Sequence, residues 1–140
     1  MKKRKNKVVL AFSGGLDTTF CAVYLKEQKM DVHALTINTG GFSNADVLRL
    51  EKHACALGVT SFKCVNVTKE YYERILKYLV FGNVLKNNTY PLSVSAERVM
   101  QAIAAAEYAK AIGASFIAHG STGAGNDQVR FDMIFNILLP

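Results

Sequence analysis

The sequence predicts an α/β protein with a doubly wound parallel sheet, and three observations support this prediction. Short apolar runs at residues 8–12, 32–38, 61–67 and 115–119 alternate with segments that have helical spacing. Glycine-rich turns follow the first and the fourth of these runs. No repeat or low-complexity linker interrupts the alternation. Parallel strands joined by right-handed crossovers require this alternation, so the predicted strand order is 3-2-1-4. A ligand crevice is expected where strands one and four diverge, beyond their carboxyl ends.

The first strand and the first helix meet in the stretch around which the rest of the chain is organised. Residues 8–12 form a short apolar run that ends at a glycine pair, as a buried parallel strand does. Helical spacing begins directly after the glycines, with apolar residues at Leu16, Phe20, Val23 and Tyr24. The sequence therefore predicts a strand, a tight loop and an amphipathic helix in succession.

The middle of the chain predicts two further strands, each followed by a helix. A helix is expected from about Asn44 to a stop at Gly58. Another is expected to begin at Thr68 and to fray between residues 82 and 88. Tyr90-Pro91 is expected to be a loop, because proline pushes the preceding residue out of the helical region.

The last part of the chain predicts a long helix, a fourth strand and a final helix. The long helix begins at Ser93 or Ser95 and ends at Gly113, with an alanine-rich face that permits close packing on a sheet. The final helix is expected to begin at Asp127, after a polar glycine loop. Its apolar side is predicted to be Val129, Met133 and Ile137.

Composition limits the classes of function. The 140 residues are 50% apolar, enough for the core of one domain, and no apolar run is long enough to span a membrane. No signal peptide is apparent, so a cytoplasmic location is expected. The three cysteines form no C-x-x-C pair, which disfavours metal and redox sites and favours buried thiols. Much of the net charge of +6 lies in a basic tail at residues 1–6, and the lack of interleaved aromatic residues argues against nucleic-acid binding.

The loop after the first strand has the composition of an anion site. Gly14 and Gly15 lack a Cβ atom, so a phosphate can approach the main chain, and Ser13, Thr18 and Thr19 add hydroxyl donors. The lysine of a Walker loop is missing. The alternative is a turn whose glycines relieve strain only, with an acidic residue that complements the helix dipole.

A second polar loop, at residues 118–131, is expected to face the first across the crevice. It contains glycines, hydroxyls, an amide, a carboxylate and a guanidinium, which together suit a ligand with carboxylate groups. Its alternative interpretation is an ordinary connection with Asp127 as a helix cap. His119, at the end of the fourth strand, is either structural or catalytic, and the structural interpretation is favoured.

The motifs resemble a known family. The first loop is similar to the Ser-Gly-Gly-x-Asp loop of the ATP pyrophosphatases, and nearly the whole chain resembles the amino-terminal nucleotide-binding domain of the argininosuccinate synthases. The matching blocks are residues 11–19, Tyr90 with Ser95, and residues 119–131. The resemblance implies a Rossmann-like, adenine nucleotide alpha hydrolase-like fold. Because the family's proteins are longer, we expect a basic tail at 1–6 and a nucleotide-binding domain at 7–140. The sheet is then cut before its next strand, and the carboxyl-terminal synthetase domain is absent.

The resemblance also implies roles for individual residues. The ATP phosphates would be held by Ala11, Phe12, Ser13, Gly14, Gly15, Leu16, Asp17, Thr18 and Thr19. The adenine would lie near Ile37, and Gly120 would close over the nucleotide. Citrulline would contact Tyr90, Ser95, Asn126 and Arg130. Aspartate would contact Thr122, Asn126 and Asp127. Catalysis would depend on Asp17, Asp127 and Arg130.

The implied reaction is the ATP-dependent ligation of citrulline and aspartate through a citrullyl-adenylate, with release of AMP and pyrophosphate, in arginine biosynthesis. Mg²⁺ would bridge the ATP phosphates, with Asp17 or Asp127 as candidate partners through water, and no dedicated protein metal site is expected. The full-length family forms homo-oligomers, and a dimer is one expected state of this chain. The 140 residues alone are expected to bind ATP weakly and to lack turnover.

Three departures from the family pattern leave alternatives open. Val94 stands where the family has a threonine near aspartate, Val99 replaces a proline, and Ala124 replaces a lysine. Each lost charged hydrogen bond would weaken binding by about 1–3 kcal/mol, so a shifted substrate is one alternative. Others are a tRNA-thiolating, amide-forming or NAD-forming ligase with the same first loop, or a nucleotide-binding domain without turnover.

Overall fold

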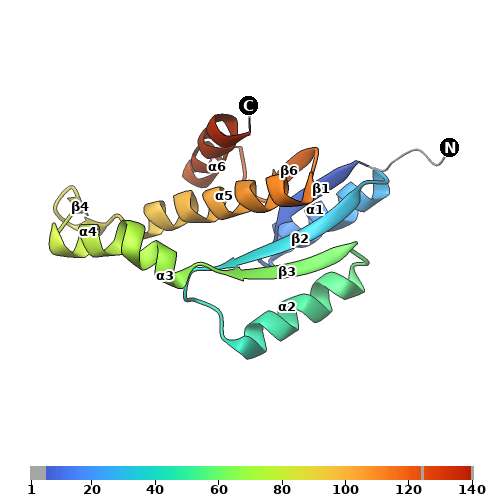
Figure 1. The fold of residues 1–140 in the computed structure, drawn as a ribbon, viewed down its shortest axis with the longest axis horizontal. Helices are drawn as coiled ribbons and strands as arrows, with labels where there is room; N and C mark the ends of the chain where they lie inside the picture. Colours follow the sequence, from blue (N-terminus) through green and yellow to red (C-terminus); the bar gives the residue numbers. More distant parts are fainter. Residues whose placement is uncertain (1–5, 124, 140) are drawn as a thin grey trace.

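The computed structural model describes residues 6–123 and 125–139, and within them the central sheet has four parallel strands in the order β3-β2-β1-β6 (Figure 1). The strands are β1 (Lys7–Ala11), β2 (Asp31–Asn38), β3 (Ser61–Asn66) and β6 (Phe116–His119). Since β6 is the fourth strand of this sheet along the chain, the predicted fold class and the predicted order 3-2-1-4 are confirmed. Val8 pairs with Val32 on one side and Phe116 on the other, so β1 lies in the middle of the sheet.

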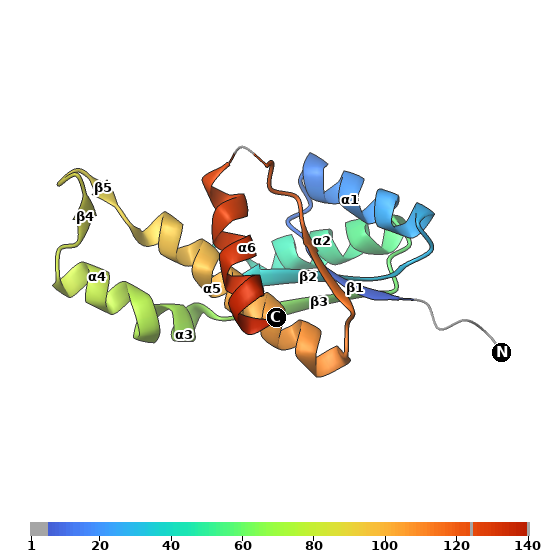
Figure 2. The same cartoon turned by 90° about the horizontal axis from the view of Figure 1, so that it is seen from above.

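Helices cover both faces of the sheet (Figures 1 and 2). The helices α1 (Leu16–Glu27) and α2 (Asn44–Ala56) pack on one face, where Leu10 and Phe12 of the first strand region meet Leu50 and Ala54 of α2. The helices α5 (Ser93–Ile112) and α6 (Asn126–Leu138) lie on the other. Their core includes Val9 and the buried alanines of α5. The alternation of side chains along β1 thus supplies both layers of core.

A helical arm and a small hairpin extend past the end of the sheet (Figure 2). Where the sequence predicts one helix, the arm has three segments: α3 (Thr68–Tyr71), the π-helical η1 (Tyr72–Leu76) and α4 (Lys77–Phe81). The strands β4 (Leu85–Lys86) and β5 (Tyr90–Pro91) then pair antiparallel. The prediction of a loop at Tyr90-Pro91 is therefore wrong. Asn87 and Asn88 adopt left-handed φ angles of 54° each, which asparagine tolerates, and they close the tight turn.

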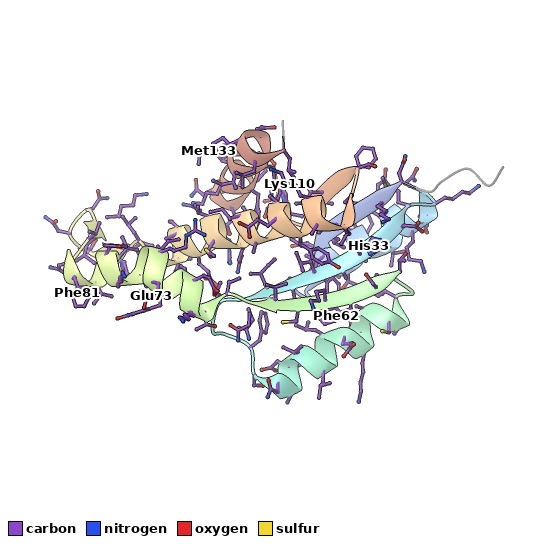
Figure 3. The ribbon with its side chains drawn as sticks, in the orientation of Figure 1. His33, Phe62, Glu73, Phe81, Lys110 and Met133 are labelled. Atoms are coloured by element: carbon purple, nitrogen blue, oxygen red, sulfur yellow. The ribbon has the colours of Figure 1, made fainter. Side chains whose placement is uncertain are left out.

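Two helices bury a different face from the one that apolar spacing predicts. In α1 the buried residues are Thr18 and Ala22, whereas Leu16 is 85% exposed. In α6 the buried residues are Phe131 and Phe135, and the predicted side is exposed at Val129, Met133 and Ile137 (Met133 is labelled in Figure 3). Small side chains let α1 approach the sheet closely, so packing distance outweighs the apolar stripe as a guide to the buried face.

The cysteines and the long helices bear on two further expectations. Cys21 and Cys64 are half-buried, but Cys55 is exposed on α2, so the expectation of buried thiols is wrong for that residue. Among the described residues, no helix combines the length and apolar character needed to cross a membrane. The basic tail predicted at residues 1–6 lies outside the described residues except for Asn6.

Candidate active site

The end of β1 is fixed to β2 by buried hydrogen bonds. The backbone N–H of Phe12 donates to the carbonyl of Leu35 at 2.8 Å. The hydroxyl of Thr36, which is 1% exposed, donates to the carbonyl of Phe12 at 2.7 Å. These bonds satisfy the buried backbone at the strand end and aim the following loop out of the carboxyl edge of the sheet.

The loop after β1 is held by its own hydroxyl groups. The Thr18 hydroxyl lies 3.3 Å from the Ser13 hydroxyl and donates to the carbonyl of Gly15 at 3.2 Å. Gly15 is the N-cap of α1, and no side chain caps this helix. The free N–H groups and the positive end of the helix dipole therefore face the crevice, as they do in sites that bind phosphate.

Two glycines allow close approaches around this loop. Gly14 has φ +74°, and a Cβ atom there would lie 2.4 Å from Cδ2 of Leu50 on α2. A Cβ atom on Gly120 would lie 3.0 Å from Cγ2 of Thr18 and 3.1 Å from its backbone nitrogen. The loop after β6 thus touches the first turn of α1 through Gly120, as expected for the two sides of one crevice.

The loop after β2 forms the third wall. Its conformation is set by Asn38, a buried side chain that sequence reasoning missed. The Oδ1 atom of Asn38 accepts hydrogen bonds from the N–H groups of Gly40 and Phe42, and its Nδ2 donates to the carbonyl of Phe42 at 2.9 Å. Ile37, at the end of β2, is 6% exposed and gives this wall an apolar surface.

A cavity of about 390 Å³ lies between these three loops and α5. Most of the residues expected to contact the nucleotide line this cavity: Ala11, Phe12, Ser13, Gly15, Asp17, Thr18, Ile37 and Gly120. Gly14, Leu16 and Thr19, which were also expected there, lie outside its lining. Gly14 packs toward Leu50, Leu16 points to solvent, and the Thr19 hydroxyl is 2.9 Å from Nε2 of His53.

A second cavity, of about 680 Å³, lies beside the first. Every residue expected to contact citrulline or aspartate lines it: Tyr90, Ser95, Thr122, Asn126, Asp127 and Arg130. Val94, one of the departures from the family pattern, lines it too, whereas Ala124 lies outside the described residues. The two cavities share Asp17, Gly120, Ser121 and Asp127, so ligands in them would meet at this common wall.

The first turns of two helices line the second cavity. Val94 and Ser95 belong to the first turn of α5, and Asn126 and Asp127 begin α6. Neither helix has a side-chain cap. Their N-terminal donors, together with the cation of Arg130, favour an anionic ligand such as a carboxylate.

Asp127 connects arginines from two helices. One carboxylate oxygen accepts from Nε of Arg98 at 3.1 Å and the other from Arg130 at 2.8 Å. Burial raises the pKa of Asp127, but the hydrogen bonds and charges of the two guanidinium groups outweigh this effect and hold the pKa below its usual value. Arg130 also donates to the hydroxyl of Ser95 at 3.0 Å. The carboxylate therefore positions both arginines at the border of the cavities.

A polar network on α5 extends this arrangement into the first cavity, and sequence reasoning did not assign it a role. The Thr39 hydroxyl donates to Glu97 at 2.6 Å, and Gln101 donates to the same carboxylate oxygen at 3.2 Å. Arg98 donates to Gln101 at 3.0 Å. The available signal was a cluster of polar residues, one helical turn apart, in a helix otherwise rich in alanine.

His119 uses both ring nitrogens in structural contacts. Its Nδ1 accepts a hydrogen bond from the N–H of Ser121 at 3.2 Å, and its Nε2 lies 3.2 Å from a carboxylate oxygen of Asp132. The ring stacks on Phe131, with 5.1 Å between centroids. The hydrogen bond from His119 lowers the pKa of Asp132. These contacts hold the loop after β6 against α6.

Metal binding by the protein alone has little support in this geometry. Within the described ranges, no group of three or more His, Cys, Asp or Glu side chains could hold a metal ion. Both oxygens of Asp127 are engaged by arginines. Asp17, which lines both cavities, has no hydrogen bond or ion pair among the described residues. On the wall that both cavities share, a cation carried in with a phosphate ligand would thus find the carboxylate of Asp17 available.

Solved structures of several other proteins share this fold. They include a predicted subunit of a tRNA methyltransferase from Methanocaldococcus jannaschii, with a TM-score of 0.62 and 22% identity over 95% of this chain and 64% of that one. NMN synthetase from Francisella tularensis has a TM-score of 0.59 at 13% identity, over 98% and 66% of the two chains. At these identities the likeness supports the fold alone.

Sequence relatives are more specific. Argininosuccinate synthase from Xylella fastidiosa is 44% identical over 126 residues, which are 90% of this chain and 31% of the relative. That of Sulfolobus acidocaldarius is 41% identical over 135 residues, 96% and 34% of the two chains. The chain thus spans about a third of the length of the curated relatives it matches. Residues 7–140 match the model of the arginosuccinate synthase N-terminal HUP domain, and the chain belongs to that family.

Proposed function

We propose that this domain binds ATP in the first cavity and citrulline with aspartate in the second, as the nucleotide-binding part of an argininosuccinate synthase. The observation that carries the proposal is the common wall at Asp17, Gly120, Ser121 and Asp127. An adenylylation reaction requires the α-phosphate of ATP to meet the amino-acid substrate, and two cavities that share a wall allow that meeting.

The first cavity suits a nucleotide at both ends. The uncapped N-terminus of α1, with the hydroxyls of Ser13 and Thr18, suits the phosphates. Ile37 and Phe12 provide apolar surface on the lining of the same cavity, where an adenine ring would bury its faces. We propose that the expected phosphate contacts act mainly through the backbone of residues 11–18.

The second cavity suits amino-acid carboxylates. Arg130 is already oriented by Asp127 and Ser95, so its guanidinium loses little conformational freedom when it binds a carboxylate. Asn126 and Thr122 line the same cavity and offer amide and hydroxyl groups to polar atoms of citrulline and aspartate. Val94 lacks the hydroxyl expected there, which weakens the aspartate side of the site.

In the proposed reaction the ureido oxygen of citrulline attacks the α-phosphorus of ATP, and the bond from that phosphorus to the leaving pyrophosphate breaks. The amine of aspartate then attacks the ureido carbon, the bond to AMP breaks, and the nitrogen loses a proton. No protein nucleophile is needed. The chain's residues position the reactants and stabilise charge, with Arg98 and Arg130 on the border of the two cavities.

Mg²⁺ is the expected companion of ATP, and it would neutralise charge on the phosphates. Asp17 is the residue with free carboxylate oxygens on the wall that both cavities share, so we propose that Asp17 binds the cation's water shell. The role of Asp127 is then to position the arginines, because its oxygens are already engaged.

We propose that a complete enzyme needs more than these residues, because the curated relatives are about three times as long as the part that matches. The domain at 7–140, a cytoplasmic location and a homo-oligomeric assembly belong to the same proposal. According to this proposal, the isolated chain of 140 residues binds substrates but does not turn them over.

Binding in two steps tests the proposal. Amide chemical shifts of the chain are followed during a titration with ATP and Mg²⁺, and then with citrulline. ATP is expected to shift residues 11–18 and Ile37, and citrulline is expected to shift Ser95, Asn126 and Arg130. GTP is the matched control, since it carries the same phosphates with a different base. Nucleotide shifts confined to another surface would contradict the proposal.

A further inference from the structure

The β4–β5 hairpin brings a lysine to the second cavity. Lys86 on β4 pairs with Tyr90 on β5, and both residues line this cavity together with residues of α5 and α6. The hairpin follows the arm that extends past the sheet (Figure 2), so Lys86 comes from a segment of the sequence that belongs to neither glycine loop.

Lys86 is the cation of this cavity that carries no partner among the described residues. The lining has two cationic side chains, Lys86 and Arg130, and two carboxylates, Asp17 and Asp127. Arg130 is held by Asp127 at 2.8 Å and by Ser95 at 3.0 Å. An ammonium group without a protein carboxylate remains available to an anion from solution.

Two features favour such an anion, although the free carboxylate of Asp17 lines the same cavity. The uncapped first turns of α5 and α6 line the same cavity and add the positive ends of two helix dipoles. Asp127 is neutralised by two arginines, so it repels an entering carboxylate weakly. A lysine acts as a point charge on a flexible stem, which suits attraction and capture more than fixed two-pronged geometry.

We propose that Lys86 binds a carboxylate group of the amino-acid substrate in the second cavity, and that it contributes to specificity for carboxylate-bearing ligands. This inference rests on the proposed function for the identity of the substrate. The substrate-contacting residues predicted from the sequence include Tyr90 of the same hairpin but no lysine. The alternative is that Lys86 is a solvated surface lysine that binds no ligand.

The test compares Lys86→Gln with Lys86→Arg and with Lys69→Gln, an exposed lysine on α3 that lines neither cavity. Dissociation constants are measured by calorimetry for citrulline, aspartate, succinate and ATP, at low and high salt. Lys86→Gln is expected to weaken carboxylate binding about tenfold, the loss of one charge-assisted hydrogen bond. Its ATP affinity is expected to stay within about twofold, and its salt dependence to decrease. The other two variants are expected to resemble the unmodified chain.

Unchanged affinity of Lys86→Gln for all three carboxylate ligands would overturn the inference. So would an equal loss of ATP binding, or no carboxylate binding by the unmodified chain. Lys86-dependent binding of succinate without binding of ATP or citrulline would support the lysine site and remove the proposed function. A thermal unfolding midpoint close to that of the unmodified chain confirms that the variant is folded.

Discussion

Replacing Gly14 with alanine tests whether the first glycine of the loop is required by packing between the loop and α2. The residue has φ +74°, in the left-handed region that residues with a Cβ atom avoid. The new Cβ atom would also lie 2.4 Å from Cδ2 of Leu50. Leu50 is 7% exposed and packs in the core with Phe12 and Ala54, so its side chain has little room to turn away.

The structure separates the two costs of this substitution. The left-handed backbone costs alanine about 1–2 kcal/mol, and overpacking of a buried site costs about 1–3 kcal/mol. Gly113 provides the matched control, because it has φ +61° and a Cβ atom there would meet nothing within 4 Å beyond its own chain neighbours. Gly113→Ala should therefore show the backbone cost alone. The difference between the two variants, about 1–3 kcal/mol, measures the contact with Leu50.

Urea unfolding measures the free energies, and Leu50→Ala in the Gly14→Ala background completes a double-mutant cycle. The double variant should be more stable than the sum of the single changes predicts, by about 0.5–3 kcal/mol, because truncation of Leu50 removes the clash. ATP affinity should fall in Gly14→Ala and persist in Gly113→Ala. Equal destabilisation by both glycine substitutions, or strict additivity with Leu50→Ala, would refute the packing argument.

Three further predictions concern the second cavity, a partly buried histidine of β2 and the length of the chain. Arg130→Ala should weaken citrulline binding at least tenfold and ATP binding far less, since its guanidinium lines the second cavity alone; equal losses in calorimetry would indicate a structural role. Burial and the nearby charge of Lys7 lower the pKa of His33, so the unfolded chain binds the proton more readily. Stability is then complete above the usual pKa of about 6.5 and falls as the pH decreases through that value, and His33→Asn should flatten this dependence in urea titrations from pH 7 to pH 5. Incubation of the chain with ATP, citrulline, aspartate and Mg²⁺ should release no pyrophosphate above background, and robust citrulline-dependent release would disprove the expectation that further residues are needed.

Local sequence determined the sheet and the position of the crevice. The apolar side chains at residues 8–12 are removed from water only in the interior, and the glycine pair that follows ends the strand before a helix begins. Right-handed crossovers then restrict the strand order, which the structure confirms as β3-β2-β1-β6. The residues expected to contact citrulline and aspartate come from two separate blocks, and the structure brings both to one cavity.

Tertiary packing decided what periodicity left ambiguous. Both α1 and α6 carry apolar residues on two faces, and apolar spacing alone selected the exposed one. In α6 Phe131 stacks on the ring of His119, Phe135 packs at an angle to both rings, and the two residues are buried in one core cluster with the alanines of α5. In α1 close approach to the sheet favours Ala22 over Phe20. The distance between a helix and the sheet depends on the side chains of both surfaces, and the apolar spacing within one helix describes only one of them.

The tertiary structure alone also shows which charged residues pair with one another and which are available to a ligand. From the sequence, Asp127 is predicted to contact a ligand. In the structure its carboxylate oxygens instead accept hydrogen bonds from Arg98 of α5 and Arg130 of α6. Lys86 reaches the second cavity because two left-handed asparagines turn the hairpin, where the sequence predicts a fraying helix and a loop. Partners that lie tens of residues apart in the chain meet only after the helices have docked. The sequence determined which chemical groups are present, and the packing of α5, α6 and the hairpin decided which of them remain free to bind a ligand.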